Sequence, residues 1–505
     1  MTDAGGRAAP APRISFSIAL VAAVTFSACH TGPPRVVPPP PAAPRVSELQ
    51  RNINAILAAP ALARGTWGVL VKSLQNDETL YTLNAHKLMM PASTQKILTL
   101  AVAADQLGWD FTYRTSVLTT GSIENSVLKG DVVVVGSGDP TFDDWDGFAT
   151  ARFAEWAAVL KRQGIQKIDG RIIGDDNAFD DEGLGAGWAW DDLAASFATG
   201  VGALQFNQNT AQLVVMPSAP GEPAHVQVTP DAARLEVLNH TITGTGAPLV
   251  VRPIAHSSTI ELNGTIAPTS ERVLRNVSVP NPTIYFGNAV RDGLLRNGIE
   301  VAGPAIDIDD LSAPLNRSNA VKSTEVVSKG LPAIAATMMK LSQNLYAETL
   351  LKTIGHHASG LGSTAAGRAV VDSTLASWGV TAGEVSDVDG SGLSRYNLVT
   401  ADALATVLRH VYQDQRLRDP FIGTLPRAGV DGTLGERMKG TAAADNVRAK
   451  TGSFSNARSV AGYVRTADGE PLEFVVMANN YGAPPKVIDD ATDAILVSLA
   501  RFSRR

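Results

Sequence analysis

Three short motifs in this chain carry side chains suited to acyl-transfer chemistry. They are Ser93-Thr-Gln-Lys96, Ser342-Gln-Asn344 and Lys450-Thr-Gly452, in that order along the sequence. A serine hydroxyl is a poor nucleophile until a nearby base removes its proton. Positions three apart share one face of a helix, so the Lys96 amine can reach the Ser93 hydroxyl if this segment is helical. A lysine serves as a base only when its pKa falls, and burial beside another cation, such as Lys450, has that effect.

The middle motif supplies a hydroxyl and an amide that a reaction of this kind could use. Two helical runs, 333–340 and 345–354, flank it, and a connection between helices can present both side chains to a cleft. Ser342 could relay a proton to a leaving amine, and Asn344 could hydrogen-bond both Lys96 and a substrate amide. Helix capping by the serine or the asparagine is the alternative, purely structural explanation.

The third motif lies at the end of a predicted strand and could align a peptide substrate. Gly452 leaves the backbone bare, so that an extended peptide can pair along the strand edge. Thr451 and Ser453 could bind a terminal carboxylate beside Lys450. The backbone N–H groups of Ser93 and Ser453 could stabilise an oxyanion. A surface strand that ends in a turn is the alternative for this motif taken alone.

Hydrophobic patterning at the two ends of the chain predicts the elements that would bring these motifs together. Near the N-terminus it predicts an amphipathic helix, a β-hairpin and a helix that is apolar nearly all round; near the C-terminus it predicts three strands and a last helix. The ranges are 46–63, 67–84 and 93–107 for the first group, and 446–452, 459–465, 472–479 and 487–502 for the second. We therefore predict one α+β domain, an antiparallel sheet flanked by helices, built from residues 46–111 and 312–505.

Residues 112–311 differ from both ends because short strand-like runs dominate them. Gly, Pro, Asn and Asp fill the gaps between these runs, as expected for turns. Helical patterns interrupt the runs at 153–163 and 288–297. We predict that this part of the chain forms one or two inserted β-rich domains.

The composition is ordinary for a globular protein and excludes several classes of function. The chain has 505 residues, enough for two or three domains, of which 44% are hydrophobic and 18% charged. Its formal net charge is −6 and its pI about 5.8, which provides no basic field for nucleic acid. The 8 histidines show no metal-binding spacing and the chain has 1 cysteine, so neither a metal site nor another cofactor is expected.

The N-terminal segment predicts export from the cytoplasm. Arg13 precedes an apolar run at 14–28, which has the length of a signal-peptide core and is short for a membrane span. Phe26-Ser-Ala-Cys29 resembles a bacterial lipobox, in which the cysteine is lipidated and becomes the mature N-terminus. A cleaved signal peptide and an uncleaved anchor are the alternatives for residues 1–29, and all three export the protein. Residues 30–45 are rich in proline and predict a stiff tether or a disordered leader.

In order and spacing, the three motifs resemble the D-alanyl-D-alanine carboxypeptidase/endopeptidase family, the class C low-molecular-mass penicillin-binding proteins. The resemblance covers residues 46–505. The long interval between the first and second motifs would hold the two extra domains that this family carries there, whereas class A β-lactamases have a far shorter interval. Further stretches that match the family are Gly138–Thr141, Gly187–Leu193, Ser342–Glu348, Asp389–Ser394, Gly429–Thr433 and Arg448–Ser453.

The resemblance implies a penicillin-binding, transpeptidase-type domain that works through an acyl-enzyme. The implied roles are Ser93 as nucleophile, Lys96 as general base, Ser342 and Asn344 as proton relay and positioning pair, and Lys450 as carboxylate ligand that also tunes Lys96. The implied protein is a periplasmic serine D,D-carboxypeptidase and endopeptidase that acts on peptidoglycan peptides and is acylated by β-lactams. A β-lactamase or esterase on the same core, and a catalytically silent cell-wall binding protein, are the alternatives.

The family also suggests that an acidic residue of an inserted domain binds the free amine of a peptide side chain. Asp192 is the candidate for this role, and Asp191 is its rival. A solvated aspartate at a helix start is the structural alternative. Apart from a lipid anchor at Cys29, no contact with a membrane is expected.

Overall fold

The computed structural model describes residues 44–144, 147–255 and 257–505. The predicted signal peptide or lipobox with Cys29, and the proline-rich linker up to residue 43, lie outside the described residues. Within the described ranges, none of the helices is both long enough and apolar enough to cross a membrane.

A five-stranded antiparallel sheet joins the two ends of the described chain. Its strand order is β2-β1-β22-β21-β20, and β1 pairs with β22 over its whole length. The strands are β1 (Thr66–Ser73), β2 (Thr79–Leu83), β20 (Arg448–Phe454), β21 (Ala457–Arg465) and β22 (Pro471–Asn479). The predicted hairpin and the three predicted C-terminal strands therefore form one sheet, with β20 at its edge.

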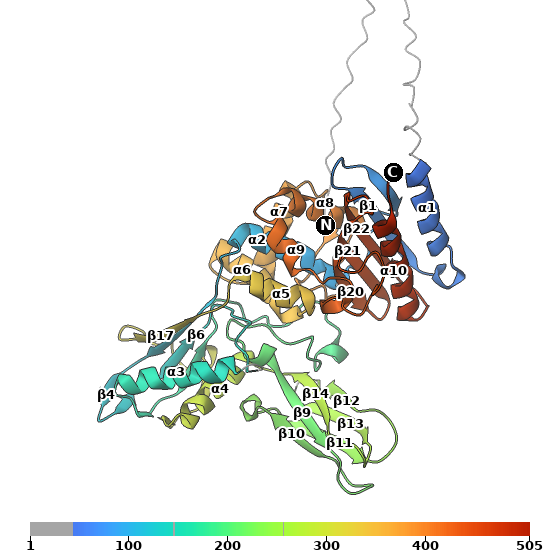
Figure 1. Ribbon diagram of the computed structural model, residues 1–505. Helices are drawn as coiled ribbons and strands as arrows, with labels where there is room; N and C mark the ends of the chain where they lie inside the picture. Colours follow the sequence, from blue (N-terminus) through green and yellow to red (C-terminus); the bar gives the residue numbers. More distant parts are fainter. Residues whose placement is uncertain (1–43, 145–146, 256) are drawn as a thin grey trace, which may run out of the picture. The chain divides into compact units, whose positions relative to one another are not determined.

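Both faces of this sheet are buried, because alternate side chains of a strand point to opposite faces. In β22, Phe474 and Val476 pack in one hydrophobic core, whereas Val475 and Met477 pack in another. Helices α1 (Pro44–Leu57) and α10 (Pro485–Arg501) cover the first face and lie side by side (Figure 1). The second face is covered by α2 (Lys96–Leu107), α5 (Leu331–Lys340), α6 (Asn344–Ser359), α7 (Thr364–Ser377), α8 (Ala401–Gln413) and α9 (Arg418–Thr424).

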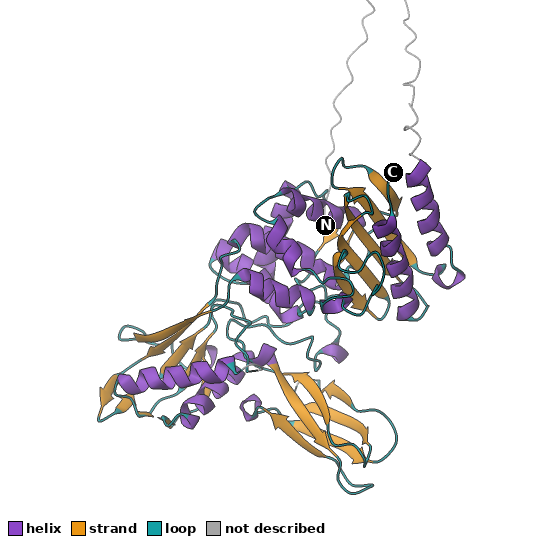
Figure 2. Ribbon diagram, viewed as in Figure 1, coloured by secondary structure: helices purple, strands orange, loops and turns teal. Residues whose placement is uncertain are grey.

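Figure 2 shows the resulting arrangement of helices around the sheet. The predicted α+β domain built from both ends of the chain is confirmed. Helix α2 is its central element, since residues 97–104 are all buried. The first motif falls at the start of this helix: a 3₁₀ turn, Ala92–Gln95, leads directly into it. Side chains three apart eclipse one another in a 3₁₀ turn, which brings Ser93 and Lys96 together.

The inserted part of the chain begins with an α/β unit. Its five-stranded sheet has the order β16-β8-β6-β3-β17, and two helices pack with it. These elements are β3 (Arg114–Thr119), β6 (Val132–Val135), β8 (Ile172–Asp175), β16 (Ala305–Asp307), β17 (Val321–Val327), α3 (Phe148–Arg162) and α4 (Pro282–Arg296). A smaller sheet beside it contains β4 (Ser122–Glu124), β5 (Val127–Lys129), β7 (Lys167–Ile168) and β15 (Glu300–Val301).

A second inserted unit consists of two three-stranded sheets. Their orders are β10-β9-β14 and β11-β13-β12. The strands are β9 (Thr210–Met216), β10 (His225–Thr229), β11 (Val237–Thr243), β12 (Val250–Pro253), β13 (Ile260–Ile266) and β14 (Val273–Ser278). A two-stranded sheet of β18 (Val385–Ser386) and β19 (Leu398–Val399) lies outside the inserted part.

The pairing of β17 bears on the C-terminal boundary of the inserted part, which the sequence pattern placed at residue 311. Strand β17 follows residue 311, the predicted boundary, yet it pairs antiparallel with β3. We therefore propose that the inserted part ends near residue 328, where the chain enters α5.

Candidate active site

The structure brings Ser93 and Lys96 into direct contact. Lys96 Nζ lies 3.0 Å from Ser93 Oγ, 2.6 Å from Asn344 Oδ1 and 2.7 Å from the Ser391 carbonyl oxygen. A neutral amine has two hydrogens and one lone pair. If the two hydrogens are donated to the two carbonyl oxygens, which are acceptors only, the lone pair faces the Ser93 hydroxyl. This geometry suits proton transfer from Ser93 to Lys96.

Burial lowers the pKa of Lys96, as proton transfer from Ser93 would require. Its side chain is fully buried, and the loss of hydration lowers its pKa to about 7. Negative charge on Glu348 and Asp389 would raise the pKa and limits the shift. A substantial fraction of Lys96 is therefore uncharged near neutral pH, as a general base requires.

A buried glutamate holds the Ser391 carbonyl in place. Glu348 accepts hydrogen bonds from the backbone N–H groups of Gly390, at 2.9 Å, and Ser391, at 2.7 Å. Burial, followed by the charge of Asp389, raises the pKa of Glu348, and the hydrogen bonds from Gly390 and Ser391 oppose this shift. The matching stretches of sequence included both Glu348 and Ser391, but nothing in their side-chain types indicated that a backbone oxygen would contact Lys96.

Ser342 and Asn344 lie at the junction between α5 and α6. Ser342 has a left-handed φ of +60°, a strained conformation of the kind that clusters at functional sites. Asn344 is the first residue of α6, and its amide donates to the Phe197 carbonyl oxygen at 2.7 Å while its Oδ1 faces Lys96. The capping function falls to Gln343, whose side chain accepts from the Leu345 N–H. Ser342 and Asn344 remain available to the site.

Lys450 reaches the same place from β20. Its Nζ donates to Ser342 Oγ at 2.8 Å and to the Thr451 carbonyl oxygen at 2.7 Å. Burial and the nearby Lys96 lower the pKa of Lys450 well below its usual range. Lys96 thus contacts Ser93 and Lys450 contacts Ser342 at one site, although the two lysines are 354 positions apart in the sequence.

Gly452 also allows a close packing contact that the sequence pattern did not indicate. A Cβ atom at this position would lie 2.2 Å from Ser459 Oγ, 2.5 Å from the Pro91 carbonyl oxygen and 2.9 Å from the Ser93 nitrogen. The missing side chain therefore allows β20 to pack against the segment that carries Ser93. The strand is an edge strand, so the predicted pairing with an extended peptide remains available.

An open cleft of about 580 Å³ lies in front of the lysines. Among its lining residues are Ser93, Ser342, Asn344, Thr451, Ser453 and Asp192. Six of the predicted site residues thus line one cleft, while Lys96, Lys450 and Gly452 are buried. Thr451 also donates to Thr433 Oγ1 at 2.6 Å, a partner that the sequence did not indicate.

The structure separates the two aspartate candidates. Asp192 lines the cleft, whereas Asp191 is exposed and is not among the lining residues that the structure describes. Partial burial and the charge of Asp191 raise the pKa of Asp192, while Arg395 lowers it. Arg395 lines the same cleft, so this end carries charges of both signs.

Comparisons with known proteins agree with this fold. The model of the D-Ala-D-Ala carboxypeptidase 3 (S13) family matches residues 49–501. The D-alanyl-D-alanine carboxypeptidase of Actinomadura sp. (strain R39) is 33% identical over 475 residues, 91% of this chain and 86% of that protein. D-alanyl-D-alanine carboxypeptidase DacB of Haemophilus influenzae is 29% identical over 440 residues, 85% of this chain and 89% of that protein.

A solved structure extends this likeness to three dimensions. The crystal structure of penicillin-binding protein 4 (dacB) from Haemophilus influenzae matches with a TM-score of 0.79 at 27% sequence identity, over 90% of this chain and 99% of that chain. The fold is therefore of the penicillin-binding type. The chain belongs to the D-Ala-D-Ala carboxypeptidase 3 (S13) family of serine peptidases, which confirms the resemblance found in the sequence.

Proposed function

We propose that this protein is a serine D,D-carboxypeptidase and D,D-endopeptidase that acts on peptidoglycan stem peptides and cross-links. The observation that carries the proposal is the buried Lys96, with its pKa near 7 and its contacts to Ser93, Asn344 and the Ser391 carbonyl. A serine and a lysine held in this way are an activated nucleophile and its base.

In the proposed reaction, Ser93 Oγ attacks the carbonyl of the penultimate D-Ala and transfers its proton to Lys96. The backbone N–H groups of Ser93 and Ser453 stabilise the oxyanion, and one such donor is typically worth about 2.7–4 kcal/mol. Lys450 and Ser342, 2.8 Å apart, pass a proton to the departing amine. Water then hydrolyses the acyl-enzyme. Its hydroxyl joins the acyl carbon, its proton replaces the one that Lys450 and Ser342 gave to the amine, and Ser93 Oγ leaves with the proton held by Lys96.

The two ends of the cleft determine which groups a substrate must carry. Lys450, Thr451 and Ser453 bind the terminal carboxylate of a D-Ala-D-Ala peptide. Asp192 binds the free amine of the side chain at the third position of the stem peptide, beside the positive charge of Arg395. The departing group is D-Ala from a free stem or the amino group of a cross-link.

β-Lactams should acylate the same serine, because their strained amide places a carbonyl and a carboxylate where the peptide places its own. Penicillin-binding protein 4 from Haemophilus influenzae has been solved in a complex with a β-lactam. We extend this property to the present chain as part of the proposal.

We further propose that the protein is exported to the periplasm and carries a lipid at Cys29. Both parts of this proposal rest on the apolar run at 14–28 and the residues that follow it. Incorporation of a labelled fatty acid that disappears on Cys29→Ala supports the anchor; unchanged incorporation contradicts it.

Product analysis tests the activity. Purified protein should release D-Ala from a stem pentapeptide and separate cross-linked muropeptides into their two stems, as read by mass spectrometry. Ser93→Ala should reduce both products to background while the circular dichroism spectrum stays unchanged. Products of unchanged yield from Ser93→Ala would show that another residue carries the reaction.

A further inference from the structure

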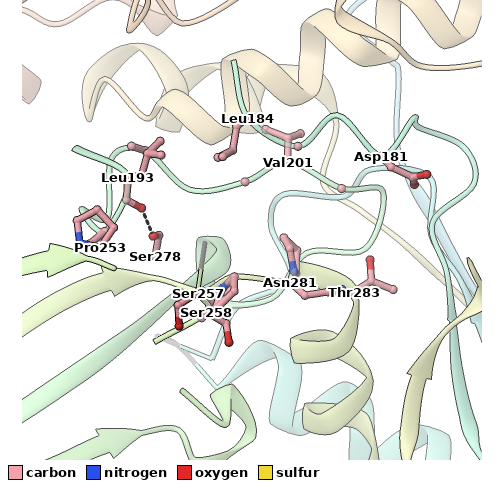
Figure 3. A pocket seen from close by; sticks show the side chains of 18 of the residues that line it. Asp181, Leu184, Leu193, Val201, Pro253, Ser257, Ser258, Ser278, Asn281 and Thr283 are labelled. Atoms are coloured by element: carbon pink, nitrogen blue, oxygen red, sulfur yellow. Dashed lines mark hydrogen bonds between the residues drawn. The ribbon is translucent and has the colours of Figure 1, made fainter. Parts of the chain in front are cut away.

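A second and larger cavity shares one wall with the catalytic cleft. It has a volume of about 750 Å³ and is drawn in Figure 3. The shared wall is the segment 190–198: Asp192 and Phe197 line the cleft, whereas Leu193 and Ala198 line the cavity. The Phe197 carbonyl in this wall also holds Asn344. None of the reaction steps proposed above uses the cavity.

One end of the cavity carries unbalanced negative charge. Asp176, Asp181, Asp307 and Asp309 line it, and no lysine or arginine is among the lining residues in the described ranges. Burial, together with the charges of Asp307 and Asp309, raises the pKa of Asp176 to about 6. Asp176 Oδ2 accepts from Thr283, but its Oδ1 is buried without a hydrogen-bond partner among the described residues.

The opposite end combines apolar and hydroxyl-bearing side chains. Leu193, Pro253 and Ser278 lie at this end in Figure 3, away from Asp181 and Thr283. Leu184 also lines the cavity and is 52% exposed. A ligand that fills both ends combines a cationic group with an uncharged, partly apolar body, which a bare metal ion lacks.

We infer that this cavity binds a second stem peptide of the same polymer through its free side-chain amine. The inference rests on the proposed function, because hydrolysis of a cross-link breaks an amide and leaves one stem with a new primary amine, protonated at neutral pH. The protonated amine of that product can pair with the aspartates, and its alanine methyl groups can contact Leu193 and Pro253 at the opposite end. The second stem then lies one wall away from the stem held in the cleft.

Calorimetric titration of penicillin-acylated protein tests the inference, since acylation occupies the catalytic cleft. The probe is a synthetic stem tetrapeptide with a free side-chain amine at its third residue, and the matched probe has this amine acetylated. Saturable 1:1 binding of the free amine is expected, with at least tenfold weaker binding of the acetylated peptide. The comparison between the free and the acetylated peptide requires no change in the protein.

Variants locate the site. Asp176→Asn/Asp309→Asn should weaken binding of the free amine at least tenfold. The matched control, Glu222→Gln/Asp231→Asn, removes two exposed acidic groups of the inserted part that line neither cavity and should leave binding unchanged. Thermal unfolding of each variant verifies that it is folded.

Several results would overturn the inference. Two of them are the absence of saturable binding and equal binding of the two peptides. Loss of binding through Asp192→Asn alone would place the peptide in the cleft, and stoichiometric binding of Ca²⁺ that displaces the peptide would show a metal site instead. Failure of penicillin to acylate the protein contradicts the proposed function instead. In that case the same titration on Ser93→Ala still decides whether the cavity binds the peptide.

Discussion

At the scale of single residues, the account depends on the protonation state of Lys96. In the uncharged amine, donation of both hydrogens to the Asn344 and Ser391 carbonyl oxygens leaves the lone pair facing Ser93. Only the uncharged form can accept the serine proton. Burial lowers the pKa, and the neighbouring acidic groups Glu348 and Asp389 act in the opposite direction.

This protonation state predicts the pH dependence of acylation. The pKa of Lys96 in the folded protein is about 7, so the neutral fraction grows as pH rises through 7 and is nearly complete about one pH unit higher. The second-order rate constant for acylation by a penicillin should level off above pH 8 and fall about tenfold per pH unit well below pH 7. Stopped-flow measurement between pH 5 and 9 checks this, and a rate that is constant over that range contradicts it.

At the scale of elements, the site depends on how closely β20 packs against the turn that carries Ser93. Gly452 makes this approach possible, because the nearest atoms to an added Cβ include the backbone oxygen of Pro91. Backbone cannot rotate away as a flexible side chain can. The distance between the strand and the nucleophile is therefore set by the absence of one methyl group.

Gly452→Ala should destabilise the protein by about 1–3 kcal/mol, the usual cost of overpacking, and slow acylation. The control is Gly423→Ala in α9, where an added Cβ meets nothing within 4 Å and the residue is exposed. That change should be neutral or stabilising by up to about 1 kcal/mol. Thermal unfolding and penicillin labelling measure both effects. Equal unfolding temperatures for the two variants would falsify this view of the strand.

Sequence reasoning identified the side chains of the site but not the backbone around them. Ser93, Lys96 and Lys450 could be found because their chemistry resides in side chains with a recognisable spacing. The carbonyl groups of Ser391 and Phe197 could not, because every residue has one and only the fold selects which faces the site. The same holds for β17, whose pairing with β3 depends on a strand that lies 202 to 213 positions earlier in the chain (321 − 119 and 327 − 114) and not on its own pattern.

At the scale of the whole molecule, the inserted part contributes directly to the catalytic domain. Its segment 188–205 reaches the domain at three hydrogen bonds: Trp188 Nε1 to Asp389 Oδ2 at 2.9 Å, Asn344 Nδ2 to the Phe197 carbonyl at 2.7 Å, and Gln205 Nε2 to Thr349 Oγ1 at 2.9 Å. Asp389 in turn accepts from backbone N–H groups of the loop that presents the Ser391 carbonyl. The insertion therefore supports the geometry around Lys96.

Trp188→Phe tests this support because it keeps an aromatic side chain and removes the indole N–H together with part of the bicyclic ring. Loss of this hydrogen bond to a carboxylate should cost about 1–3 kcal/mol and reduce the acylation rate. Trp109→Phe is the matched control, since the buried Trp109 Nε1 has no hydrogen-bond partner among the described residues. If both variants acylate at the rate of the unmodified protein, the contact with Asp389 has no part in the site.

The most direct test of the central claim is to locate the covalent adduct formed with a penicillin. Fluorescent penicillin should label the protein with one adduct per chain, and peptide mass spectrometry should place it on Ser93. Ser93→Ala should show no labelling while its unfolding temperature stays close to that of the unmodified protein. Full labelling of Ser93→Ala, or an adduct on any other residue, would contradict the assignment of Ser93 as nucleophile and of Lys96 as its base.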